Sequence, residues 1–164
     1  MMRPTIKSAL AVLLLAGASA AWAEVNVTYV KPDEFMDVPR SEIERERVLK
    51  DFSQYFATLD KKLPAGQQLN IEVLDIDLAG QLWPRRSSGE DIRIMKGGAD
   101  WPRMQLRYTL LENGKVLRSG EDNISNMMYQ QRFTRHTSSD PMRYEKQMID
   151  DWFEKAIVPK VAAK

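Results

Sequence analysis

The chain has 164 residues, of which 43% are hydrophobic and 29% are charged, and this composition fits one ordinary globular domain. A disordered tail and a multidomain enzyme are therefore both excluded. The 24 basic residues nearly balance the 23 acidic residues, so the net charge of +1 provides no field that would favour nucleic acid as a partner. Cysteine is absent, which excludes disulfides, thiolate nucleophiles and cysteine-based zinc sites.

The first 23 residues (1–23) have the pattern of a signal peptide. Arg3 and Lys7 make the start positive, residues 9–18 are almost entirely apolar, and Ala21-Trp22-Ala23 has the small residues of a cleavage site. A membrane anchor is the alternative, but the apolar run has only about half of the roughly 20 residues that a spanning helix needs. We therefore expect one mature domain, residues 24–164, in the periplasm, with no transmembrane anchor after signal cleavage.

Three elements are predicted in the first half of this domain. Residues 25–30 are rich in β-branched side chains that alternate between two faces, which favours a strand. Ser41 and Glu44 form a capping-box pattern before a helix whose apolar residues recur at helical spacing as far as Leu63. Residues 68–78 predict a second strand that is apolar on both faces, as is typical of a strand covered on both sides.

The second half begins with a long segment, residues 79–103, in which only residues 91–95 have the pattern of a short strand. Residues 104–111 then alternate and lead to Asn113-Gly114, which is a strong hairpin signal. A return strand is therefore expected over residues 115–124.

The last predicted element is a helix. Asp140 has the pattern of an N-cap with Pro141 at the first helical position, and an apolar stripe follows as far as Pro159. The whole order, β-α-β-(β)-β-β-α, predicts a single α+β domain with a largely antiparallel β-sheet and two main helices packed on one face.

Several stretches of the chain resemble a bacterial family known as domain of unknown function 3016. They are residues 71–80, the step from Trp101-Pro102-Arg103 into residues 106–110, and residues 140–146 with the downstream segment 150–153. The resemblance covers essentially the whole mature chain. It implies an exported protein of Gram-negative bacteria, and it implies no reaction, cofactor or catalytic residue.

Two groups of residues could carry chemistry of a catalytic or metal-binding kind. Asp75 and Asp77 are predicted on the same face of a strand, with Cβ atoms about 7 Å apart, a spacing that suits general acid/base pairing or ligation of a hard cation. The alternative is that both carboxylates accept hydrogen bonds from nearby arginines or loop amides, and we favour it because no further oxygen ligands can be assigned. His136 is the single histidine, its nearest hydroxyls are Ser138 and Ser139 in an irregular loop, and the chain has no Gly-x-Ser-x-Gly elbow.

Tryptophan and arginine recur together in the long segment, as Trp-Pro-Arg steps at 83–86 and 101–103. Tryptophan faces can stack on sugars and arginine forks can hold anionic groups, and the loop over residues 126–139 has a similar aromatic and basic character that could line the other wall of one groove. The alternative is that the tryptophans close the end of the core and that the arginines pair with Asp75, Asp77 or the acidic side of the last helix. The candidate binding residues are Trp83, Arg85, Arg86, Trp101, Arg103, Arg132 and Arg135.

These observations lead to two hypotheses of different classes. The first is a non-enzymatic binding or interaction module of the cell envelope, without a cofactor, whose partner is an envelope protein or an anionic glycan contacted through the Trp/Arg loops. The second is a small periplasmic hydrolase or metal-dependent enzyme that uses Asp75, Asp77 and His136. A shared pocket for these three residues would favour the enzyme.

The signal-peptide pattern predicts a mature amino terminus at Glu24, because cleavage follows the small residues of the 21–23 site. The intact mass of protein recovered from the periplasm measures this directly. A full-length species retained in the inner membrane would contradict the interpretation.

Overall fold

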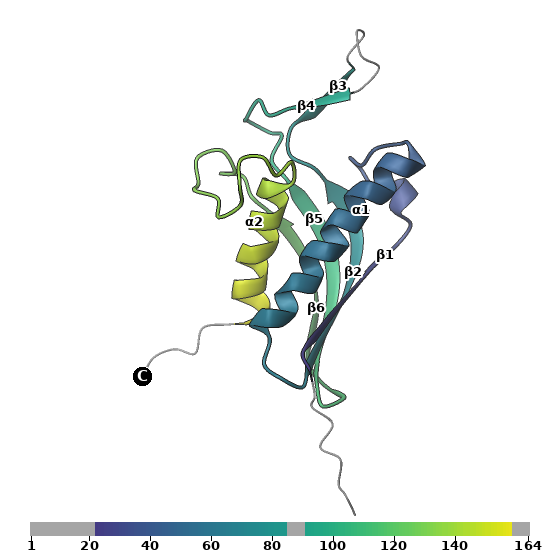
Figure 1. Ribbon diagram of the computed structural model, residues 1–164, viewed down its shortest axis with the longest axis vertical. Helices are drawn as coiled ribbons and strands as arrows, with labels where there is room; N and C mark the ends of the chain where they lie inside the picture. The colour runs from purple at the N-terminus through teal and green to yellow at the C-terminus, as the bar shows by residue number, and fades with distance from the viewer. Residues whose placement is uncertain (1–21, 85–90, 159–164) are drawn as a thin grey trace, which may run out of the picture.

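A computed structural model describes residues 22–84 and 91–158, and it confirms the predicted α+β class. Two helices and six strands account for the regular structure of this part of the chain (Figure 1). Short 3-10 turns at Pro32–Glu34 and Thr58–Lys62 and a π-helical turn at Phe153–Ile157 flank the helices. The elements are β1 (Glu24–Tyr29), α1 (Glu42–Ala57), β2 (Gln67–Asp77), β3 (Gln81–Pro84), β4 (Asp91–Ile94), β5 (Arg103–Glu112), β6 (Lys115–Ser125) and α2 (Arg143–Trp152).

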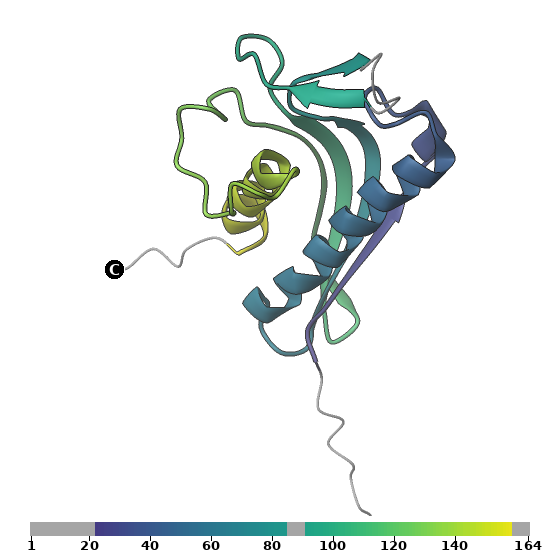
Figure 2. The same cartoon turned by 45° about the horizontal axis from the view of Figure 1, so that its top comes forward.

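The main sheet has four strands in the order β1-β2-β5-β6. β1 runs parallel to β2, as the crossover through α1 requires, and the other neighbours are antiparallel. Both helices lie on the concave face of the curved sheet, with α1 over β1 and α2 over β6 (Figures 1 and 2). The opposite face of the sheet is open, so the predicted placement of both helices on one face is confirmed. In the described ranges, no helix has the length and apolar character that a membrane span requires.

A β-bulge in β2 explains why its sequence is apolar at both parities. Leu69, Ile71 and Val73 are buried under the helices, and the pairing register with β5 then shifts between Val73 and Asp75. After this shift Ile76 is the residue that points into the core. The expectation that both faces of this strand are covered was therefore wrong: the apolar side chains change parity at the bulge and stay on one face.

The predicted start of the first helix is confirmed, and that of the second is not. Ser41 is the N-cap of α1, although its side chain makes no capping hydrogen bond. Asp140 and Pro141 form a turn before α2, in which the Asp140 carboxylate accepts a bond of 2.8 Å from the Met142 amide, and the helix begins at Arg143. In contrast, the hairpin between β5 and β6 is confirmed, with positive φ angles of 49° at Asn113 and 79° at Gly114.

The long segment after β2 contains a hairpin of two short strands, β3 and β4, which projects from the body of the molecule as an arm (Figure 1). The prediction over residues 91–95 is confirmed by β4, whereas its partner β3 was not predicted. At the base of the arm, Gly80 has a φ of 82°, and a Cβ there would lie 2.6 Å from the Ile94 carbonyl oxygen. Only glycine fits this position.

A buried carboxylate joins the base of the arm to α2. Glu145 is only 1% exposed, and its Oε1 accepts a hydrogen bond of 2.8 Å from the Ala79 amide. From β4, the Arg93 guanidinium donates to the Ala79 and Gly80 carbonyls and forms an ion pair of 2.7 Å with Asp37. These contacts fix where the chain leaves β2.

Replacing Trp152 by alanine is expected to destabilise the fold by about 3 to 5 kcal/mol, the usual cost of deleting a large buried aromatic side chain. Its ring packs edge-on against Tyr108 at 5.7 Å, and its indole nitrogen donates to Asp122 at 2.9 Å. Denaturant unfolding of Trp152→Ala measures the effect, with Phe133→Ala, at a side chain that is 90% exposed, as the control. Equal midpoints for the two variants would contradict the packing argument.

Stability is expected to fall with rising pH because of Glu145. Burial raises the pKa of this carboxyl above its ordinary value of 4.5, so folding favours the protonated form. Its favourable contribution is complete below that ordinary value and is lost as the pH rises through the folded pKa. Glu145→Gln should therefore gain stability relative to wild type as the pH is raised, as measured by denaturation between pH 5 and pH 8. The exposed change Glu42→Gln is the control, and parallel pH profiles for wild type and Glu145→Gln would exclude this effect.

Candidate functional site

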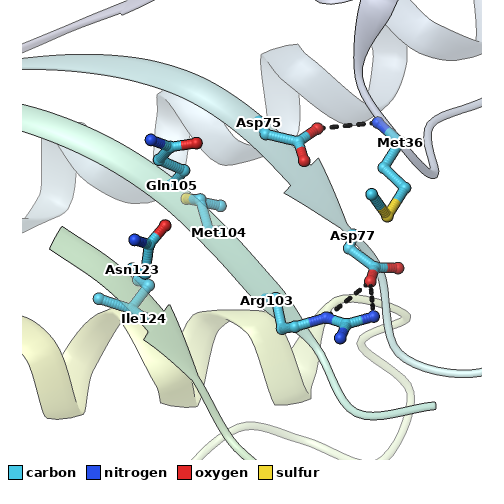
Figure 3. A pocket seen from close by; sticks show the side chains of 8 residues that line it. All are labelled: Met36, Asp75, Asp77, Arg103, Met104, Gln105, Asn123 and Ile124. Atoms are coloured by element: carbon cyan, nitrogen blue, oxygen red, sulfur yellow. Dashed lines mark hydrogen bonds and ion pairs between the residues drawn. The ribbon is translucent and has the colours of Figure 1, made fainter. Parts of the chain in front are cut away.

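A hollow of about 510 Å³ lies where β2 ends, β5 begins and β6 ends (Figure 3). The antiparallel register builds it, because Asp77 pairs with Arg103, Asp75 with Gln105, and Gln105 with Asn123. The side chains of these residues lie on the open face of the sheet near the base of the arm. The lining residues are Met36, Asp75, Asp77, Arg103, Met104, Gln105, Asn123 and Ile124.

A second hollow of about 540 Å³ adjoins the first, and Met36, Asp77 and Arg103 line both. Its other walls come from the base of the arm, including Gly80 and Leu82, and from the loop after β4, including Lys96 and Asp100. We call the two hollows together the sheet-end cleft.

Asp75 and Asp77 are each held through one oxygen. Asp75 Oδ1 accepts from the Met36 and Ile76 amides at 2.8 and 2.9 Å, and Asp77 Oδ2 accepts two bonds from the Arg103 guanidinium (Figure 3). The other oxygens, Asp75 Oδ2 and Asp77 Oδ1, accept no hydrogen bond from any described residue. Gln105 donates its amide hydrogen to Glu121 and so keeps its carbonyl oxygen as an acceptor. The cleft is therefore rich in hydrogen-bond acceptors.

Both tryptophans of the Trp-Pro-Arg steps stack near cations that line this cleft. The Lys96 ammonium lies 4.3 Å from the Trp83 ring centroid, and the Arg103 guanidinium carbon lies 5.6 Å from that of Trp101. The Trp83 side chain is 48% exposed. Arg103 thus lines the cleft itself, whereas Trp83 and Trp101 contact the lining side chains Lys96 and Arg103 without lining either hollow.

The remaining predicted binding residues do not join this group in the described part of the chain. Arg132 pairs with Asp151 at 2.6 Å and Arg135 pairs with Glu154 at 2.7 Å, so both guanidinium groups are engaged by carboxylates of the last helix and the turn after it. Arg132 lines a different cavity, beside α2. Arg85 and Arg86 lie outside the described residues.

His136 belongs to a separate polar cluster between α1 and α2. Its Nε2 lies 3.1 Å from Asp150 Oδ2 and 3.3 Å from the Tyr55 hydroxyl, and Lys62 donates to Asp150 Oδ1 at 3.0 Å. Burial alone would raise the pKa of Asp150, but bonds from Tyr55, Lys62 and His136 outweigh it and hold that pKa below its ordinary value. Burial and the neighbouring Asp150 raise the pKa of Tyr55. The cluster therefore acts as a charged clamp between the helices.

The residues of the enzyme hypothesis are thus divided between two places. Asp75 and Asp77 share the sheet-end cleft, whereas His136 contacts α1 and α2 and is absent from the lining of either hollow. Within residues 22–84 and 91–158, no group of three or more histidine or carboxylate side chains could hold a metal ion.

Among the lining residues that sequence reasoning did not assign to a site are Met36, Gln105 and Asn123 of the first hollow. Met36 lies in an irregular segment whose position depends on the Asp75 bond and on a bridge between Asp37 and Asp77. Gln105 and Asn123 could have been placed on adjacent strands from the hairpin signal, but their alignment also depends on a bulge in the β5-β6 pairing.

A comparison with curated proteins found no match, and a comparison with solved structures found none either. A family model described as a protein of unknown function, DUF3016, matches residues 23–155. This range contains all six strands and both helices, and with them every residue that lines the sheet-end cleft. The chain therefore belongs to the DUF3016 family.

Proposed function

We propose that this protein is a non-enzymatic binding module of the bacterial envelope that holds a saccharide of an envelope glycan in the sheet-end cleft. The observation that carries the proposal is the set of unfilled acceptors on a single surface, from Asp75, Asp77 and Gln105. Sugar hydroxyls are donors at close spacing, so they match a wall of carboxylate and amide oxygens.

The charge of the cleft favours a neutral saccharide over an anionic one. Four aspartates line it, at positions 37, 75, 77 and 100, against the two cations Lys96 and Arg103. Arg103 is already bound to Asp77, so little positive charge is left for an anion. The sequence led us to expect an envelope protein or an anionic glycan, and the charge of the cleft leads us to propose a neutral glycan instead.

An aromatic contact is available at the rim of the cleft. The C–H face of a pyranose packs against an aromatic ring, and a partly exposed indole offers such a surface. Neither Trp83 nor Trp101 lines the hollows, but each ring contacts a cation that does, Lys96 for Trp83 and Arg103 for Trp101. A saccharide that extends beyond the cleft could therefore reach the Trp83 ring, which is 48% exposed.

A hydrolytic or metal-dependent reaction at the same place has less support. Asp75 and Asp77 each use one oxygen to hold the protein's own donors, and His136 lies in the clamp between the helices. Location in the periplasm is part of the proposal, supported by the signal-peptide pattern of residues 1–23 and tested by the mass of the exported protein.

Asn123→Ala is expected to weaken saccharide binding about five-fold, the equivalent of one net hydrogen bond. Asn123 is exposed and makes no side-chain bond to a described residue, so the fold should be unaffected. Calorimetric titration with neutral tetrasaccharides of N-acetylglucosamine and of glucose measures the affinity. Asn26→Ala, an exposed asparagine on β1, is the matched control.

Two results would overturn the proposal. One is equal affinity of the Asn123→Ala and Asn26→Ala variants for every saccharide that binds wild type. The other is binding of a polyamine such as spermidine with no binding of either tetrasaccharide, since an acceptor-rich cleft also suits ammonium donors.

A further inference from the structure

The outer edge of β6 has no partner strand in the described structure, because β6 is the last strand of the sheet order β1-β2-β5-β6. The strand is 11 residues long and contains no proline. An edge of this kind presents alternate backbone N–H and C=O groups that can pair with another extended chain.

A groove of about 460 Å³ runs along the last part of this edge. Four consecutive residues of β6, 122–125, line it. Side chains of successive strand residues point to opposite faces, so four in a row can line one groove only if it follows the backbone edge. The groove therefore gives access to the unpaired hydrogen-bonding groups of β6.

The other wall of the groove is one face of a helix. Its residues follow the spacing i, i+3, i+4, i+7 and i+8 along α2 and the π-helical turn after it. They are Met148, Asp151, Trp152, Lys155 and Ala156. A strand added to a sheet makes two kinds of contact. Its backbone pairs with the edge strand, and its side chains pack on the helix face beside that edge.

We propose that this groove binds an extended segment of a partner protein, added as a fifth strand beside β6, with an acidic side chain facing Lys155. The proposal concerns a second surface and does not depend on saccharide binding in the sheet-end cleft.

The charges of the groove explain the acidic preference. Asp151 is paired with Arg132 at 2.6 Å, and the Asp122 carboxylate accepts the Trp152 indole N–H at 2.9 Å. Lys155 is exposed and forms no ion pair with any residue in the described ranges. An incoming carboxylate is the complement that this ammonium lacks, while Ile124 and Met148, both nearly buried, form the apolar floor of the groove.

A second copy of this chain fits the groove less well. Pairing two copies through Asp122 or Asn123 would bring the two Asp122 carboxylates directly opposite or diagonal to one another across the new strand pair. Like charges at these positions destabilise a sheet. The occupant is therefore a different polypeptide.

The probe is a set of blocked eight-residue peptides in which valine and threonine alternate, with glutamate, glutamine or lysine placed at each position in turn. Titration of the mature protein, followed by backbone amide NMR signals, gives both the affinity and the site. The peptide with glutamate at one particular position should bind most tightly, and it should shift the backbone amide signals of residues 122–125. Methylating alternate peptide amides should weaken binding about ten-fold, since it removes strand hydrogen bonds.

Reversing the charge at position 155 tests the contact between Lys155 and the acidic side chain of the peptide. Lys155→Glu should weaken the best glutamate peptide by about ten-fold and strengthen its lysine counterpart, whereas Lys50→Glu, an exposed lysine on α1, should do neither. Gln105→Ala, at a residue that lines the cleft and not the groove, should leave peptide binding unchanged, and Lys155→Glu should leave saccharide binding unchanged. A loss of saccharide binding can therefore be distinguished from a loss of peptide binding.

The proposal is overturned if no peptide binds, if methylated and unmethylated peptides bind equally, or if Lys155→Glu behaves like Lys50→Glu. It is also overturned if sedimentation shows that the protein alone forms a dimer that Lys155→Glu dissociates, because the groove would then serve a second copy.

Discussion

The contact between Glu145 and the Ala79 amide controls the arrangement of the functional end of the molecule. A carboxylate in an apolar interior is costly, and Glu145 Oε2 has no partner among the described residues. The contact nevertheless ties α2 to the point where the chain leaves β2, and Arg93 holds the next two carbonyls from the other side. The arm and both hollows of the cleft are placed by these few bonds. A buried polar contact with one allowed geometry specifies this position better than apolar packing alone would.

The bulge in β2 has a second effect on the cleft. Before the bulge, Leu69, Ile71 and Val73 point into the core, and after it Ile76 does. The two residues that flank Ile76 therefore point to the open face. Asp75 and Asp77, both partly buried, thereby lie on the open face at the end of the sheet, opposite Gln105 and Arg103. A regular strand would have placed these two carboxylates on the core face, where an ionised group is strongly disfavoured. The bulge is thus what makes a polar cleft compatible with a continuous apolar core.

Local signals in the sequence were sufficient for most elements and insufficient for the cleft. Asn113-Gly114 specified its hairpin because a two-residue turn with positive φ angles has few alternatives. Extending that turn in regular register would place Gln105 opposite Asp122, but a bulge between Leu110 and Leu111 brings Asn123 there instead. A bulge depends on contacts across the sheet, and so does the position of Met36. The pairing of Arg103 with Asp77 could be anticipated from composition, whereas its geometry beside Trp101 depends on tertiary structure.

The end of β6 borders two surfaces, because the side chains of a strand point above and below the sheet while its backbone groups point along the plane of the sheet. The Asn123 side chain points to the open face and lines the cleft, while the backbone of the same residue borders the groove beside α2. The two surfaces differ chemically, since the cleft is rich in hydrogen-bond acceptors and the groove borders both the donors and the acceptors of a strand edge. Asp122 connects them mechanically: its bond to Trp152 fixes α2 against the strand whose next residue reaches the cleft. Packing at this point therefore lets one strand hold both surfaces in place.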